Sequence, residues 1–284
     1  MKQPSKTRAD HGKPRPATHP ESGEHDGDAS FATTLAKGLS VIEAFGLKSP
    51  ALGNTELAAK TGLTRPTVAR LAHTLAQLGY LQYDETRSKY RLGVRALRLL
   101  HPLLANLKVR QVARPLMQEL SESVRGIVSL GMIDGTSSVY VETARAGEVG
   151  SHVPDIGAAV PLVRTTVGRA LVSLLSADER TVLDARIRSE TPDLWRSYEQ
   201  NYRAGIQQCA QQGYCLSYGD WVPTLHAVGA PLFRVRSTGN CFAINCGVPA
   251  FRLRAGQLET EIGPRLHALA ASIRSIVEEP QAGN

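Results

Sequence analysis

The chain has 284 residues, of which 42% are hydrophobic, and it carries a formal net charge of +7. This length and composition allow two domains of ordinary size, each with its own core. No apolar run approaches the ~20 residues that cross a membrane, and no secretory signal stands at the N-terminus, so we expect a cytoplasmic protein.

Residues 1–30 contain almost no large apolar side chain, and five Lys/Arg balance five Asp/Glu there. Such a composition cannot build a core, which predicts a disordered tail. A helix is expected over residues 33–46, where apolar residues recur at helical spacing. Its expected inner stripe consists of Leu35, Leu39, Ile42 and Phe45.

Residues 54–78 have the pattern of two helices joined by a tight turn. Asn54 is expected to cap the first helix, Gly62 to make the turn and Thr64 to cap the second helix. The second helix carries apolar residues on one face and polar or cationic residues on the other. The two sets are Val68, Leu71, Leu75 and Leu78 against Thr67, Arg70, His73, Thr74 and Gln77. A DNA recognition helix needs this division, and an ordinary solvated helical hairpin shows it too.

Two short strand patterns follow, over residues 80–83 and 89–92, joined by a polar turn. Three helices and then a hairpin is the order of a winged helix domain. Residues 31–100 hold ten Lys/Arg against four Asp/Glu, so nearly all of the excess charge lies here. Double-stranded DNA is the partner that this placement favours. The expected contacts are Arg70 at a base edge, His73 and Thr67 beside it, and Thr64, Arg65, Arg87 and Lys89 at phosphates.

The second half of the sequence mixes helical and strand patterns. Helices are expected over residues 94–107, as a linker, and over about 108–124. A hairpin around Asp134-Gly135 opens a series of further elements. These are a loop over 145–161, helices near 166–176, 178–188 and 198–212, strands over 213–217, 227–235 and 240–246, and a last helix near 254–277. This order predicts an α+β domain whose antiparallel sheet is flanked by helices, with Tyr140, Trp221 and Phe233 in its core.

The sequence contains no G-x-S-x-G, H-E-x-x-H, P-loop or G-x-G-x-x-G motif. Its four cysteines lack metal-ligand spacing and are expected as reduced, buried thiols. They are Cys209, Cys215, Cys241 and Cys246. We therefore expect no catalytic residue, no cofactor and no metal. Two alternative functions stay open: a DNA-binding architectural protein without a ligand and, less favoured, an enzyme built on the second domain.

Several separated segments resemble the isocitrate-lyase-regulator (IclR) family of bacterial transcription regulators. They are AKGLSVIEAF, ELAAKTGLTRPTVARLAHTLAQLGYL and KYRLG in the first half, and VPLVRTTVGRALVSLL, GYCLSYGDW, HAVGAPLF and NCGVPAF in the second. The resemblance implies a winged helix-turn-helix domain over 31–93, a linker helix over 94–107 and a GAF-like effector-binding domain over 108–280. It also implies homodimers, often paired into tetramers on a palindromic operator, and a small organic-acid effector that acts through the linker, commonly in control of a catabolic operon.

The same resemblance places the effector carboxylate at the backbone amides of Thr166 and Val167, where a helix begins, and an unpaired helix N-terminus suits an anion. The implied effector contacts are Arg164, Thr165, Thr166, Val167, Asp220, Leu225, Ala227, Asn245 and Gly247. Three residues depart from the family pattern: Val163 replaces a histidine, Arg164 a small residue and Asn245 a serine. Arg164 is expected either as a bidentate carboxylate contact or as a surface cation. Asp220 is expected either to accept a ligand hydroxyl or to close a turn.

Overall fold

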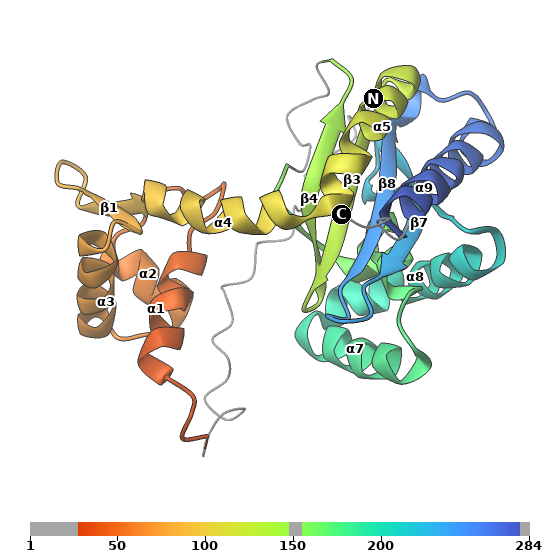
Figure 1. Cartoon of the computed structure of the whole chain (residues 1–284). Coiled ribbons are helices and arrows are strands. Elements are labelled where there is room, and N and C mark those ends of the chain that lie inside the picture. The colour runs from red at the N-terminus through yellow and green to blue at the C-terminus, as the bar shows by residue number, and fades with distance from the viewer. Residues whose placement is uncertain (1–27, 148–154, 279–284) are drawn as a thin grey trace, which may run out of the picture. The chain divides into compact units, whose positions relative to one another are not determined.

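The computed structural model describes residues 28–147 and 155–278 of the chain. The chain divides into two compact units, of which the first ends at Leu103 and the second begins at Leu104. Figure 1 traces the elements of each unit in chain order. The expected disordered tail, residues 1–30, falls almost wholly outside the described residues.

The first unit is a winged helix-turn-helix domain, as the sequence predicts. Its three helices pack around a small apolar core, and a two-stranded antiparallel hairpin forms the wing. The elements are α1 (Thr33–Glu43), α2 (Asn54–Thr61), α3 (Arg65–Gln77), β1 (Leu81–Asp84), β2 (Lys89–Leu92) and the helix α4 (Val94–Asn106) that follows them. The core residues include Val41, Leu52, Leu57, Val68, Leu71 and Leu81.

Local turn chemistry is confirmed at two of three expected positions in this unit. Gly62 has a φ of 70°, which a glycine adopts without strain. The Thr64 side chain accepts a hydrogen bond from the amide of Thr67 and caps α3. The expectation for Asn54 is wrong, because Gly53 is the capping residue of α2 and its amide donates to Glu56 Oε2 at 2.8 Å.

The predicted inner stripe of α1 is wrong for Leu35 and Leu39, whereas Phe45 packs against the core of this unit. The helix buries Gly38, Ser40 and Val41, whereas Leu35 and Leu39 are 64% and 49% exposed. Helical spacing shows that an apolar face exists, but it does not show whether that face packs within the chain. The apolar residues of α1 that remain outside therefore form part of the surface of this unit.

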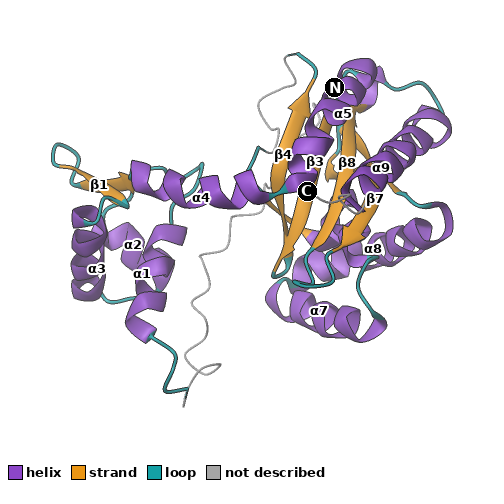
Figure 2. Ribbon diagram, viewed as in Figure 1, coloured by secondary structure: helices purple, strands orange, loops and turns teal. Residues whose placement is uncertain are grey.

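The second unit is built on a six-stranded antiparallel sheet with the strand order β5-β4-β3-β8-β7-β6. Figure 2 shows the strands of this sheet and the helices beside it. The strands are β3 (Ile127–Asp134), β4 (Ser137–Arg145), β5 (Ala159–Pro161), β6 (Cys215–Val222), β7 (Leu225–Arg234) and β8 (Cys241–Pro249). The helices are α5 (Lys108–Val124), the short η1 (Leu162–Arg164), α6 (Thr166–Val172), α7 (Ala177–Glu190), α8 (Pro192–Gln212), the short η2 (Ala250–Arg252), the π-helical η3 (Leu258–Ile262) and α9 (Gly263–Glu278).

The sheet separates two cores. Residues such as Val128, Leu130 and Ile244 pack with α5 and α9 on one face. On the other face α6 is wholly buried and packs with α8 over strands β7 and β8. This second face holds a separate cluster that includes Tyr140 and Val167. The α+β arrangement of an antiparallel sheet flanked by helices is confirmed.

Several boundaries in this unit differ from the expectations. Strand β5 lies at the end of the expected loop, since three residues are too few to give an alternating pattern. The last helix begins at Gly263, after the π-helical turn, rather than near residue 254. Tyr140 is buried as expected, but Trp221 and Phe233 are only half-buried. Among the described helices, none is both long and apolar enough to cross a membrane.

Candidate functional site

Helix α3 presents a polar, cationic face to solvent. Val68, Leu71 and Ala72 bury its other face against the core of the first unit. The side chains of Arg65, Arg70 and His73 are exposed, while Thr67 is half-buried beside the Thr64 cap. The two threonine hydroxyls lie 2.9 Å apart, which fixes the start of the helix. The five predicted contacts of this helix therefore lie on its outer side and at its N-terminus.

The wing presents Arg87 and restrains Lys89. The Asp84 carboxylate accepts hydrogen bonds from the Thr86 hydroxyl at 2.6 Å and from the Arg87 amide at 3.2 Å, and these bonds shape the turn. The same hydrogen bonds, that of the Thr86 hydroxyl first, hold the pKa of Asp84 below its usual value. Lys89 pairs with Glu56 of α2 at 3.0 Å. Arg87 is thus exposed at the tip, and Lys89 is held beside Glu56.

The turn between η1 and α6 is tightly closed. Thr165 Oγ1 donates to the Pro161 carbonyl at 3.0 Å and accepts from the Gly168 amide at 3.2 Å. A Cβ atom on Gly168 would lie 2.2 Å from the Leu162 carbonyl oxygen, so only glycine fits here. The amide of Gly168 is therefore occupied by the cap, while the preceding amides, those of Thr166 and Val167, begin a helix and have no intrahelical acceptor.

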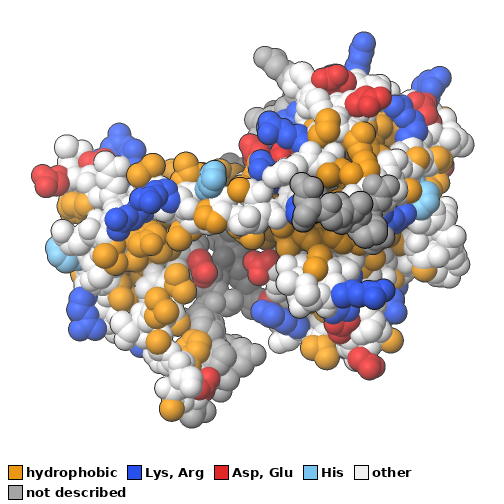
Figure 3. Space-filling view, in the orientation of Figure 1, with side chains coloured by type: hydrophobic (Ala, Val, Ile, Leu, Met, Phe, Trp, Pro, Cys, Tyr) orange, Lys and Arg blue, Asp and Glu red, His pale blue; other side chains and the backbone are white. Residues whose placement is uncertain are grey.

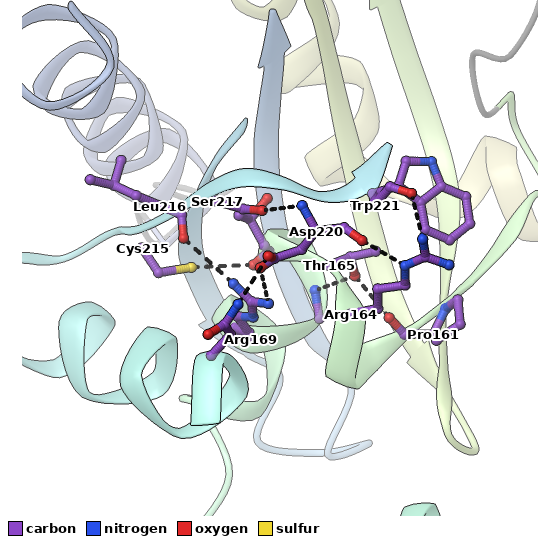
Figure 4. Close-up of polar contacts among 12 residues, drawn as sticks. Pro161, Arg164, Thr165, Arg169, Cys215, Leu216, Ser217, Asp220 and Trp221 are labelled. Atoms are coloured by element: carbon purple, nitrogen blue, oxygen red, sulfur yellow. Dashed lines mark hydrogen bonds and ion pairs between the residues drawn. The ribbon is translucent and has the colours of Figure 1, made fainter. Parts of the chain in front are cut away.

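Arg164 holds the end of strand β6. Its Nε donates to the Asp220 carbonyl at 2.6 Å and its Nη2 donates to the Trp221 carbonyl at 2.9 Å. The guanidinium also lies 5.2 Å from the ring centroid of Tyr198 and 5.4 Å from that of Trp221. Figure 4 shows this side chain reaching toward Trp221. Arg164 is half-buried and engaged with the main chain, an arrangement that neither sequence alternative includes.

A buried ion pair lies beside this turn, and sequence reasoning missed it. Arg169 is 1% exposed, and its Nη2 donates to Asp220 Oδ2 at 2.5 Å (Figure 4). Asp220 Oδ1 accepts from Asn201 Nδ2 at 3.0 Å, and the Asp220 amide donates to Ser217 Oγ at 3.3 Å. Both carboxylate oxygens of Asp220 are thus already used within the chain. The only sequence signal was a cation inside an apolar helical pattern.

The remaining predicted contacts lie on two adjacent strands. Ala227 is opposite Gly247, and Leu225, at the start of β7, is opposite Pro249. Asn245 is opposite Gly229, whose missing side chain makes room for α6, since a Cβ there would lie 2.3 Å from the Thr166 carbonyl oxygen. Strands β7 and β8 and the η1–α6 turn therefore bring the nine predicted residues onto one side of the sheet.

The cysteines of the second unit are all free and buried. The neighbouring Cys215 thiol and burial together raise the pKa of Cys209, and burial raises the pKa of Cys246 to about 12. Such thiols stay protonated and are poor nucleophiles and ligands. Within residues 28–147 and 155–278, no cluster of three His, Cys, Asp or Glu side chains is suited to a metal ion.

Family models and known proteins match almost the whole chain. The family model "IclR helix-turn-helix domain" matches residues 34–85, and "Bacterial transcriptional regulator IclR C-terminal" matches residues 101–275. The regulator TsaQ1/TsaQ2 of Comamonas testosteroni is 28% identical over 91% of this chain and 94% of its own. The p-hydroxybenzoate hydroxylase transcriptional activator of Acinetobacter baylyi is 26% identical over 91% and 97%. A crystal structure of an IclR family transcriptional regulator from Brucella abortus is 38% identical, with a TM-score of 0.80 over 88% of this chain and 94% of that one.

Proposed function

The chain belongs to the IclR family of bacterial transcriptional regulators, and we propose that it binds a specific operator in a manner that a small organic acid controls. It is a DNA-binding regulator and not an enzyme, as its relatives are named. The single observation that carries the finer proposal is the exposed face of α3, with Arg65, Arg70 and His73 on a buried apolar support.

The proposed division of labour on DNA follows from side-chain chemistry. Arg70 lies in the middle of the exposed face, and a guanidinium binds O6 and N7 of guanine with two parallel hydrogen bonds. Thr64 and Arg65 stand at the start of α3, where the helix meets the edge of the groove and its amides favour phosphate. Arg87 at the tip of the wing is suited to the adjacent backbone.

We propose that a second copy of the chain covers the apolar surface of α1 and α4. No residue of α4 is buried, although it carries Val94, Leu97 and Leu100 with exposed fractions of 78%, 65% and 46%. Hydrophobic side chains lie along this helix in the space-filling view (Figure 3). Exposed apolar residues in such number mark an interaction surface. A two-fold dimer would then present two copies of α3 to half-sites about one helical turn apart.

The effector is proposed to bind on the side of the second unit's sheet that carries α6. The turn at Thr165, Thr166 and Val167 offers helix-start amides to a carboxylate. Arg164 and Asp220 are proposed to shape this site by fixing the end of β6, since Arg164 donates to the Asp220 carbonyl and the Asp220 carboxylate accepts from Arg169. A catabolic operon is the proposed target, in line with the relative named as a hydroxylase activator.

The test is selection of duplexes from a random pool by the full chain. The proposal expects enrichment of a two-fold-symmetric sequence with half-sites about 10 base pairs apart. Enrichment of nothing beyond bent or A·T-rich DNA would instead favour an architectural protein. The acid is tested separately, by a thermal-shift screen of organic acids on the same protein, because a ligand stabilises the state that it binds.

A further inference from the structure

A small hollow lies at the β6 edge of the second unit's sheet, and its volume is about 190 Å³. Tyr218 of β6 and His226 of β7 form one wall and are opposite one another in the strand register. His226 is in turn opposite Val248, which belongs to the core beneath α5 and α9. Paired residues of neighbouring strands share a face of the sheet. The hollow is therefore on the face that carries α9, away from α6 and the proposed effector site.

The segment between β8 and α9 forms the other wall of this hollow. Leu258 is 2% exposed and Leu253 is half-buried, so the lining includes an apolar part. Gly256 turns the chain with a φ of 71°, and the π-helical η3 follows and runs into α9. Single π-helical turns within helices occur frequently at functional sites. The volume equals that of roughly six water molecules, so the hollow is suited to a small molecule with a short apolar side chain.

Glu259 brings a negative charge to the hollow. The Tyr218 hydroxyl donates a hydrogen bond to Glu259 Oε1, and this bond is the main reason that the pKa of Glu259 lies below its usual value. The His226 ring meets the Tyr218 ring edge-on, with the ring centroids 5.3 Å apart, and so restrains it. Among the described residues, no lysine or arginine forms an ion pair with Glu259. This carboxylate is therefore ionised at neutral pH and can bind a cation.

Arg254 brings the opposite charge to the same hollow. Its side chain is 80% exposed, and its Nη2 pairs with Glu261 Oε2 at 3.1 Å. A guanidinium has five N–H donors, so this contact leaves others for a ligand. Arg254 and Glu259 both line the hollow, but each has a different partner within the chain. An anion such as phosphate would be repelled by Glu259 and a simple amine by Arg254, so a molecule that carries both charges fits this lining best.

We propose that this hollow binds a small α-amino acid as a zwitterion, at a site separate from that of the organic acid. Glu259 binds the ammonium group, Arg254 binds the carboxylate, and Leu253 and Leu258 contact the side chain. Hydrogen bonds between charged groups are roughly twice as strong as neutral ones, and the planar fork of a guanidinium matches a carboxylate. Because both charged side chains are exposed to solvent, each contact is screened, and we expect a Kd of about 0.1–1 mM.

The test is calorimetric titration of the full chain with L-alanine and L-leucine. Propionate and ethylamine are the analogues of alanine that lack one charge each, and 4-methylpentanoate and 3-methylbutylamine are those of leucine. The variants are Glu259→Gln and Arg254→Gln, which change exposed side chains and should keep the melting temperature of the wild type. The matched controls are Glu199→Gln and Arg196→Gln, which remove the same charges from α8.

The expected result is that at least one amino acid binds, that Glu259→Gln and Arg254→Gln each raise its Kd by at least ~3-fold, and that the two controls leave the Kd unchanged. The failure of both amino acids to bind at up to ~10 mM would overturn the proposal. Binding that is equally tight in both variants would show that the amino acid is bound elsewhere. An analogue with one charge that matches the amino acid and weakens in either variant would overturn the zwitterion. The organic-acid proposal does not depend on any of these results.

Discussion

The buried pair between Arg169 and Asp220 allows a quantitative test of how the second unit is held together. Asp220→Asn keeps the size of the side chain and removes its charge, which leaves the guanidinium of Arg169 buried without a counter-charge. The side chains of the pair are 1% and 15% exposed, and their polar atoms are 2.5 Å apart. Breaking one partner of a buried pair costs about 3–5 kcal/mol.

The lower end of that range applies here. The partial exposure of Asp220 admits some solvent screening, and the hydrogen bond from Asn201 survives the substitution in altered form. A loss of about 3 kcal/mol corresponds to a fall in Tm of ~6–12 °C for a unit of this size. Urea unfolding followed by tryptophan fluorescence, with calorimetry, measures both quantities.

The matched control is Asp193→Asn, which breaks the ion pair with Arg196 at a site where both side chains are largely exposed. Its expected effect lies within about 0.5 kcal/mol. Equal effects of the two substitutions would refute the role assigned to burial. If Asp220→Asn left unfolding unchanged and abolished acid binding, Asp220 would be a ligand contact rather than a structural anion.

Three further substitutions and titrations probe other contacts. Gly168→Ala pushes a methyl group into the Leu162 carbonyl and should lower the free energy of unfolding, measured in urea, by about 2–3 kcal/mol. Unaltered stability would show that the turn is not close-packed. Thr64→Ala removes the cap of α3 and should lower the stability of the first unit by about 1 kcal/mol. Amide hydrogen exchange at the start of that helix should become faster, and unchanged exchange would show that the Thr64 side chain does not stabilise the helix. Hydrogen bonds from Arg234 and then from Ser176 lower the pKa of Glu179 to about 2. The ionised carboxylate therefore stabilises the folded state fully at pH values above its unfolded pKa of 4.5, and this stabilisation is lost as the pH falls through about 2. Arg234→Gln should therefore raise the pKa of Glu179, measured by NMR titration of its carboxyl group, and an unchanged pKa would contradict the pairing.

The sequence predicted the features that local chemistry determines. The turn glycine Gly62, the cap Thr64 and the apolar side of α3 each depend on neighbours within a few residues, and all three are present, except that Leu78, expected on the apolar side, is 48% exposed. The hairpin of β3 and β4 was predictable because two apolar segments flank an Asp-Gly turn. Such signals need no knowledge of what lies across the fold.

Long-range pairings were not predictable in the same way. Arg169 and Asp220 are 51 residues apart in the chain, and Lys89 and Glu56 are 33 apart. Nothing in either local pattern shows that the charges meet. The resemblance to known regulators placed Asp220 in the effector site, but it could not show that both carboxylate oxygens are engaged by Arg169 and Asn201. In the same way, the spacing of Leu35 could not show that it stays outside the core.

The most direct measurement of the central claim is the affinity of wild type and Arg70→Ala for the selected operator and for random DNA at one salt concentration. Arg70 is exposed on α3 and is proposed to bind a guanine, so the variant should lose ~1–3 kcal/mol at the operator and almost nothing on random DNA. One base position in each half-site should become tolerant of substitution. Equal weakening on both DNAs would make Arg70 a phosphate contact and would contradict α3 as the helix that recognises the sequence.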